Sequence, residues 1–220
     1  MFVGHYAAAL VAKRTAPRAS LALLVFAAFW LDLLWPVLLL LGAEEVVIDP
    51  GNTAVTPLDF TRYPWSHSLL TVVGWGVLLG ALVWWRRSDR RAAVVAGATV
   101  VSHWVLDWVT HRPDLPLWPG GAKVGLGLWN SVAATVTVEG ALLALGIWLY
   151  LRVSRPLRAS GRWAFVALNV FFLGIWTANL FGPPPPSVPT IAGSALLLWL
   201  LVPWAAWIER NRTTSDPHQT

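Results

Sequence analysis

A histidine and an aspartate four residues apart, His103 and Asp107, form the pair in this sequence that is best suited to chemistry. In a helix, this spacing places both side chains on one face, and His111 follows on the same face four residues later. Imidazole nitrogen and carboxylate oxygen are ligands that zinc, iron and manganese accept. Helical bundles build metal sites from such pairs together with ligands from neighbouring helices. The spacing therefore predicts part of a metal site.

Further ionisable residues lie in stretches that are otherwise apolar. Asp32 lies within FWLDLLWP, His67 within PWSHSLL, and Glu139 in the middle of a long apolar segment. His5 lies in a short apolar segment at the start of the sequence, and Asp114 follows His111. Each is a candidate for the same site, because isolated ionisable residues are rare in apolar segments unless they have a function.

The composition indicates the environment of these residues. Of the 220 residues, 56% are hydrophobic and only 12% are charged, whereas an average soluble domain has about 25% charged residues. The sequence has no cysteine, which excludes disulfides and thiolate ligands. These values exclude a disordered chain and an ordinary soluble domain, and they indicate an integral membrane protein.

Six stretches are apolar over the roughly 20 residues that a membrane span requires. The predicted fold is all-α: a polytopic bundle of membrane helices in one domain, residues 1–212, with a polar tail at 213–220. Residues 2–12 are too short to span, so we expect a re-entrant or interfacial helix there. The first long stretch exceeds the apolar region of a signal peptide, so we expect it to span. The predicted spans are 19–42, 66–85, 92–110, 126–151, 163–182 and 190–208.

Basic residues gather on one side of these spans. All but three of the 16 Lys and Arg residues lie there, and the exceptions are Arg62, Arg112 and Lys123. The positive-inside rule makes the basic side cytoplasmic and places both termini in the cytoplasm. The basic loops are short and lack interleaved aromatic residues, so we expect no nucleic-acid partner.

The ionisable residues within the spans share a band of depth, because a helix rises about 1.5 Å per residue. Measured from the nearest cytoplasmic basic residue, the depths are roughly 12 Å for His5, 18 Å for His103, 20 Å for Glu139, 21 Å for Asp32, 24 Å for Asp107 and 28 Å for His67. We therefore expect convergence between the midplane and the outer leaflet. Simpler interpretations stay open: a hydrogen-bonded pair that packs helices for His103 and Asp107, protonated carboxyls for Asp32 and Glu139, and an interfacial helix start for His67.

Four blocks of this sequence resemble the family of predicted membrane-bound metal-dependent hydrolases, also described as YdjM-like inner-membrane hydrolases. The resemblance covers residues 1–120. The blocks are Gly4-His5, FWLDLLWP with Asp32 in place of an LPDID-type stretch, Ser66-His67-Ser68-Leu69 in place of THSL, and Ser102-His103 with Asp107 followed by LPLWP at 115–119. Leu34 and Trp35 stand where the family has a second acidic residue and a histidine. The order of the ligand types is also similar to that of zinc-dependent phospholipase C and P1-type nucleases.

The resemblance implies a metal-dependent hydrolase of the bacterial inner membrane that holds one or two divalent metals, zinc first, with iron or manganese as alternatives. A phosphoester or a lipid-type substrate fits a site that faces the outer leaflet, and we expect membrane lipid as a partner. The alternatives are a small ion- or proton-coupled transporter and a structural membrane protein with a polar packing network. The expected metal ligands are His5, Asp32, His67, His103 and Asp107; the expected general bases are Glu139 and His111; the residues expected beside them are Asp114, Ser66 and Ser102.

Overall fold

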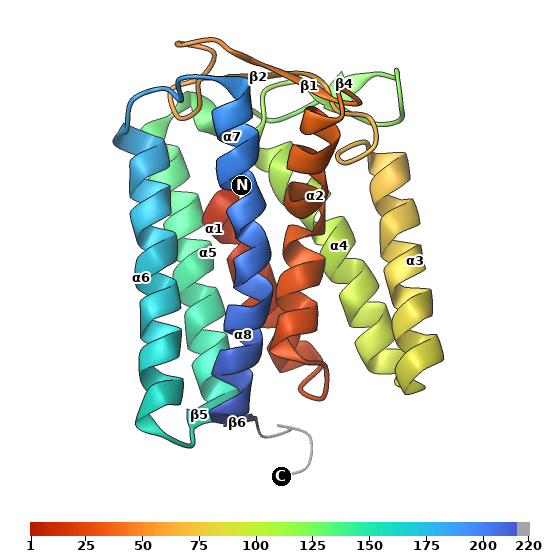
Figure 1. Ribbon diagram of the computed structural model, residues 1–220, viewed down its shortest axis with the longest axis vertical. Helices are drawn as coiled ribbons and strands as arrows, with labels where there is room; N and C mark the ends of the chain where they lie inside the picture. The colour runs from red at the N-terminus through yellow and green to blue at the C-terminus, as the bar shows by residue number, and fades with distance from the viewer. Residues whose placement is uncertain (215–220) are drawn as a thin grey trace.

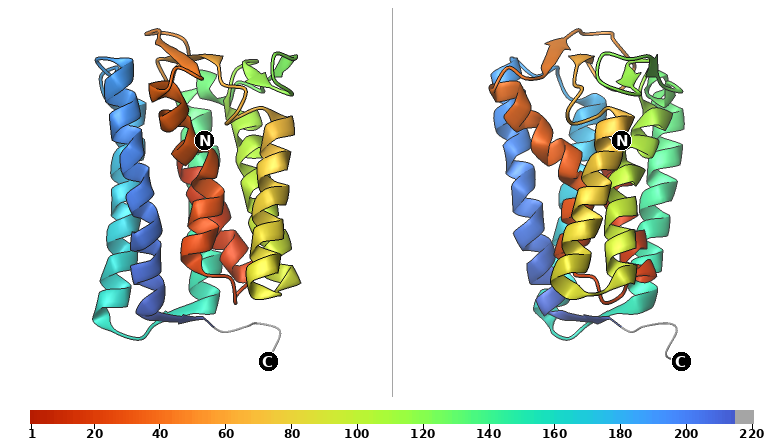
Figure 2. Two further views of the ribbon diagram at one scale, coloured as in Figure 1. Left: turned by 45° about the vertical axis from the view of Figure 1, so that its right-hand side comes forward. Right: turned by 90° about the vertical axis from the view of Figure 1, so that its right-hand side faces the viewer.

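Long apolar runs separated by short polar turns fold into helices that lie side by side along one direction (Figures 1 and 2). The computed structural model describes residues 1–214. This architecture confirms the predicted all-α bundle. The elements in chain order are α1 (Phe2–Thr15), α2 (Leu21–Leu40), β1 (Glu45–Ile48), β2 (Leu58–Arg62), α3 (Leu69–Arg87), α4 (Arg90–Thr110), β3 (Leu115–Pro116), β4 (Lys123–Val124), the 3-10 helix η1 (Leu128–Asn130), α5 (Val132–Val153), β5 (Ser154–Pro156), α6 (Ala159–Phe181), α7 (Val188–Ala195), the 3-10 helix η2 (Leu196–Leu200), α8 (Leu201–Arg210) and β6 (Arg212–Thr214).

Six helical segments are long and apolar enough to cross a membrane, as the sequence predicts. They are α2, α3, α4, α5, α6 and the continuous segment from α7 to α8. The last of these is not one regular α-helix, because the tighter helix η2 separates α7 from α8. Large apolar side chains such as Leu70, Val77 and Trp85 on α3 are exposed, which suits a surface in contact with lipid. The chain is therefore an integral membrane protein.

Two of these helices begin later than the sequence predicts, because turns precede them. Gly127 adopts a φ of 73° in the turn before η1. The hydroxyl of Ser131 then caps α5 by accepting the N–H of Ala134, so the helix begins at Val132 and not at residue 126. Before α3, the N–H of His67 bonds to the carbonyl of Tyr63 in a turn, and the helix begins at Leu69. His67 therefore lies in a turn ahead of the helix.

The short first helix, α1, lies inside the bundle, packed against α5, α2 and α4. Small residues allow this close packing. A Cβ atom added at Gly146 of α5 would lie 2.9 Å from the Cα atom of Ala7. At the other end of α1, the Nζ of Lys13 donates to the carbonyl of Ala19 and to Glu209 of α8, both at 2.7 Å. These contacts direct the start of α1 into the middle of the bundle. Of the two forms that the sequence predicts, re-entrant and interfacial, α1 therefore has the re-entrant one.

Helices α3 and α4 form a tight hairpin that fixes the position of α4. A Cβ atom added at Gly97 would lie 2.6 Å from the carbonyl oxygen of Gly76, so only glycine permits this approach. The turn between the helices uses Ser88 with a φ of 52°, and Asp89 caps α4 by accepting the N–H of Ala92. The hairpin places the outer half of α4 against α2, where the candidate site lies.

Short antiparallel strand pairs cover both ends of the bundle (Figure 1). The pairs β1–β2 and β3–β4 lie at the end that the charge pattern assigns to the outer side, and β5–β6 lies at the opposite, basic end. Thr213 and Thr214, which belong to the predicted polar tail, pair with β5. The rest of that predicted tail, residues 215–220, lies outside the described residues.

Candidate metal centre

His103 and Asp107 share one face of α4, as their spacing predicts. The Nε2 atom of His103 lies 3.1 Å from Oδ2 of Asp107, and both side chains are buried. The face points toward α1 and α2, which pack against α4. The pair is therefore enclosed by protein and not by lipid.

Asp32 of α2 and His67 of the turn before α3 lie close to this pair. The Nε2 atom of His67 lies 3.8 Å from Oδ1 of Asp32 and 3.8 Å from Oδ2 of Asp107. The Nε2 atom of His103 lies 3.7 Å from Oδ1 of Asp32. Four side chains from three separate segments thus lie close together, and each imidazole Nε2 atom lies within 3.8 Å of both carboxylates.

The spacing of these atoms fits a metal ion. Ligand atoms about 2.0–2.1 Å from a tetrahedral zinc ion lie about 3.3 Å from one another. The four measured separations, 3.1, 3.7, 3.8 and 3.8 Å, lie close to this value. The ligand atoms of Asp32, His67 and His103 all lie within 4.8 Å of one another. The buried His and Asp side chains can therefore hold a metal ion.

Hydrogen bonds on the far side of each imidazole fix which nitrogen carries the proton. The Nδ1 atom of His103 lies 2.7 Å from the carbonyl oxygen of Ala28, and a carbonyl only accepts, so Nδ1 carries the proton. The Nδ1 atom of His67 lies 2.7 Å from Oγ of Ser66. Ser66 donates to Glu44 at 2.6 Å, so its oxygen accepts the proton of His67. When the two imidazoles are neutral, their Nε2 atoms present lone pairs, which is how metal-binding histidines are oriented.

With this protonation, a lone pair of His103 lies close to two carboxylates, an arrangement that a bound cation would stabilise. The Nε2 atom of His103 is buried and has no hydrogen-bond partner among residues 1–214. Its lone pair faces the carboxylates of Asp32 and Asp107 at 3.7 and 3.1 Å. Electron-rich atoms this close repel one another in a buried site, and an unpaired buried polar atom costs free energy. A divalent cation between them satisfies all of these atoms.

The first helix brings His5 to the opposite side of Asp107. The Nε2 atom of His5 lies 3.1 Å from Oδ1 of Asp107, and its ring stacks on that of His103 with centroids 3.5 Å apart. The amino group of Met1 also contacts Oδ1 of Asp107. His5, His103 and Asp107 form a second group that could hold a metal ion. Because one imidazole nitrogen binds one metal, His103 serves only one of the two groups at a time.

Glu139 of α5 lies in the same cavity as the cluster. Its Oε1 atom accepts the indole N–H of Trp129 at 3.3 Å. Its Oε2 atom is buried and has no partner within the described part of the chain. This free carboxylate oxygen is placed to accept a proton from a molecule in the cavity.

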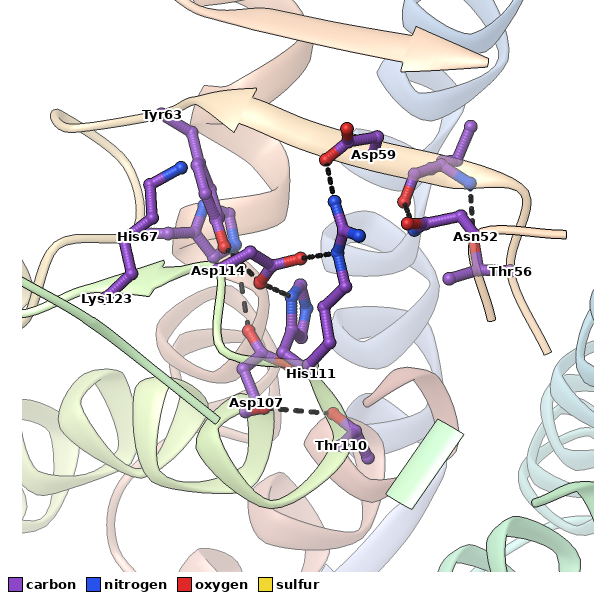
Figure 3. A network of polar contacts seen from close by, with 12 residues as sticks. Asn52, Thr56, Asp59, Tyr63, His67, Asp107, Thr110, His111, Asp114 and Lys123 are labelled. Carbon is purple, nitrogen blue, oxygen red and sulfur yellow. Dashed lines mark hydrogen bonds and ion pairs between the residues drawn. The ribbon is translucent and has the colours of Figure 1, made fainter. Parts of the chain in front are cut away.

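His111 lines the cavity from the end of α4, held by a separate network (Figure 3). Its Nδ1 atom donates to Oδ1 of Asp114 at 2.9 Å, and the hydroxyl of Tyr63 donates to the same oxygen at 2.9 Å. Arg112 contacts both Asp114 and Asp59. Burial, together with the negative charge of Asp114, raises the pKa of Tyr63 well above its usual value, so the hydroxyl stays protonated and donates. Asp114 therefore orients His111 and does not face the metal cluster.

Of the two serines that the sequence predicts beside the site, only one lies next to the cluster. Ser66 lies beside the cluster as a link between His67 and Glu44. Ser102 does not contribute, because it lies on another face of α4 and its hydroxyl donates to the carbonyl of Thr99. Glu44 is a residue that the sequence analysis missed. Its only signal is an acidic pair, Glu44-Glu45, in an outer loop, with no fixed spacing to Ser66.

Comparison with known proteins adds no relative. No protein-family model matches the chain, and no curated protein or solved structure matches it.

Proposed function

We propose that the chain is a membrane-embedded, metal-dependent hydrolase that acts on an ester, most simply a phosphoester, in the outer half of the bilayer. The observation that carries the proposal is the buried Nε2 atom of His103, which has no hydrogen-bond partner among residues 1–214 and lies 3.7 Å from Oδ1 of Asp32 and 3.1 Å from Oδ2 of Asp107. The motif resemblance to YdjM-like hydrolases supports the same function and a bacterial inner membrane. Zinc is our first choice of metal, because histidine nitrogen and carboxylate oxygen are ligands that zinc accepts.

The metal and the residues of the cavity would divide the chemistry between them. When bound, a divalent metal lowers the pKa of a coordinated water molecule and polarises the scissile bond. Asp32, His67, His103 and Asp107 would hold it, and His5 would support Asp107. Glu139 accepts the proton of water as the water oxygen bonds to phosphorus. The phosphorus–oxygen ester bond then breaks, and Glu139 returns the proton to the leaving alkoxide. His111, oriented by Asp114, is the alternative base.

The metal content of the purified protein tests this function first. We expect near-stoichiometric zinc, iron or manganese in the detergent-purified protein, measured by inductively coupled plasma mass spectrometry. His103→Ala and the isosteric Asp32→Asn should lose it. Ser102→Ala is the matched control, because its hydroxyl bonds within its own helix. Hydrolysis of a chromogenic phosphodiester should follow metal content across these variants. Absence of metal, even after incubation with each of the three ions, would overturn the proposal.

A proton- or ion-coupled transporter is less well supported by the same geometry. Transport requires a polar route from the site to both sides of the membrane. On the basic side of the cluster, Tyr6, Leu10 and Leu24 are fully buried within an apolar cluster. This apolar packing on the basic side favours a site that reacts over one that conducts.

A further inference from the structure

The cavity in front of the metal centre is open on one particular side. It has a volume of about 490 Å³ and is lined by residues of several elements. Most of these lining residues are buried or half-buried, including His5, Asp32, His67, Asp107 and Glu139. The exposed ones all lie in one stretch, from the end of α6 to α7, and are Ala178, Asn179, Gly182, Pro183, Thr190 and Ser194. The opening therefore lies between the outer ends of two membrane helices.

The way the two helices pack explains this opening. Helix α6 packs against α8 and α1, whereas α7 packs against α2 and β1. Four consecutive prolines, Pro183–Pro186, join their outer ends, and such a run is a stiff, extended spacer. The residues that border the gap are mostly small, such as Ala178, Gly182 and Ser194. The helices are thus held apart where their side chains are too small to fill the space.

The end of the cavity that faces the outer solution is covered. The connection between β1 and β2 contributes Val55, Thr56 and Pro57 to the lining, and all three are half-buried. This connection is held by its own hydrogen bonds, in which the hydroxyl of Thr53 accepts the N–H groups of Val55 and Thr56. A molecule that reaches the metal centre therefore enters from the side, where the surface of the protein meets lipid.

The walls of the cavity suit an apolar chain. Trp35, Phe60, Trp176 and Ile191 are among the residues that line it. No lysine or arginine lines the cavity within the described residues. The nearby Arg112 is engaged by Asp59 and Asp114. A free, highly charged phosphate compound would find no fixed cationic side chain here, whereas an amphiphile would bury its chain and present only its head to the metal.

We infer that the substrate is a phospholipid-type amphiphile of the outer leaflet, which enters between the outer ends of α6 and α7. Its phosphoester head reaches the metal centre, and its acyl chain stays between Trp176 and Ile191 and continues into the membrane. The inference that the headgroup is a phosphoester rests on the proposed function. The route itself rests on the position of the opening alone.

Photo-crosslinking in lipid nanodiscs tests the route without any measurement of activity. The probe is a phosphatidylethanolamine that carries a diazirine on one acyl chain, and mass spectrometry maps the adducts. We expect adducts concentrated within residues 176–194. Ala178→Trp should reduce them strongly, because the indole fills the gap. Thr177→Trp is the matched control, since Thr177 is also exposed on α6 but does not line the cavity. Adducts spread evenly over the exposed faces of α3 and α6, or equal effects of both substitutions, would overturn the route.

Hydrolysis separates the route from the proposed function. The ratio of turnover of the long-chain phospholipid to that of water-soluble p-nitrophenyl phosphocholine should fall about tenfold in Ala178→Trp and stay near the wild-type value in Thr177→Trp. A ratio that does not change in Ala178→Trp would overturn lipid entry at this gap. Crosslinking at residues 176–194 in a protein that binds no metal and hydrolyses neither compound would sustain the lipid site and overturn the hydrolase.

Discussion

The Nε2 atom of His103 faces Oδ2 of Asp107 at 3.1 Å, while its Nδ1 atom donates to the carbonyl of Ala28 on α2. The pair could hold a metal ion together with its neighbours. In the neutral imidazole, the proton on Nδ1 is held by Ala28, and Nε2 directs a lone pair toward the carboxylate. The arrangement keeps a lone pair and a carboxylate oriented toward one point, which is what a metal ion requires.

Removal of metal should lower the stability of the folded protein. A ligand that binds only the folded state at 100 times its dissociation constant stabilises by about 2.7 kcal/mol. We therefore expect a chelator to lower the Tm of the detergent-solubilised protein, and added zinc to restore it. The same treatment should leave the Tm of His103→Ala unchanged, because that variant has no site to empty. A chelator effect of equal size in both proteins would contradict a site at His103.

Glu44 should influence metal affinity although it lies outside the ligand cluster. It accepts the hydroxyl proton of Ser66, which in turn accepts from His67, so it orients the ring of His67. Loss of such a supporting hydrogen bond typically lowers metal affinity about 10–100-fold. We expect this loss in Glu44→Gln, measured by competition with a chelating indicator.

The neighbouring glutamate provides the control for that experiment. Glu45 is exposed and pairs with Arg62 at the surface. Glu45→Gln removes the same charge from the adjacent position, so a purely electrostatic effect would appear in both variants. A specific role for Glu44 predicts that metal affinity falls in Glu44→Gln but not in Glu45→Gln. Ser66→Ala breaks the same link between His67 and Glu44, so we do not expect it to restore the affinity.

The spacing of His103 and Asp107 could be read from the sequence because the helical period alone determines which residues share a face. The membrane spans could be predicted for a similar reason, since bilayer thickness sets the length of an apolar run. Depth along the membrane also follows from residue counting. Asp32 and His67 could be placed at the right depth in this way, before any knowledge of packing.

The rotation of each helix could not be predicted, because it depends on which side chains fit together. Ser102 is adjacent to His103 in sequence, yet a helix turns by about 100° per residue, and its hydroxyl meets its own backbone. Glu44 depends on a turn and a strand pair whose geometry leaves no periodic pattern. The lateral opening depends on which elements pack against α6 and α7. Two of these partners, α1 and α2, are far from α6 and α7 in sequence.

The close approach of α1 to α5 should be necessary for His5 to reach Asp107. A Cβ atom at Gly146 would lie 2.9 Å from Cα and 3.0 Å from the carbonyl oxygen of Ala7, both backbone atoms that cannot move independently. We expect Gly146→Ala to lower the free energy of unfolding by about 1–3 kcal/mol through overpacking. Gly174→Ala on α6 is the control, because nothing lies within 4 Å of its Cβ position. Unfolding in detergent with added denaturant compares the two, and equal stability would contradict the close approach.

Glu139 should be required for turnover but not for binding of the metal. Its Oε2 atom is buried in the cavity without a partner in residues 1–214, and its other oxygen is held by Trp129. General-base catalysis contributes roughly 10²–10⁴-fold to a rate, so we expect Glu139→Gln to lower kcat by that order while the metal content stays near that of the wild type. His111→Asn is the comparison, because His111 lines the same cavity and Asp114 holds its proton on the far nitrogen. If kcat falls more in His111→Asn than in Glu139→Gln, while both variants retain the metal, His111 and not Glu139 is the general base.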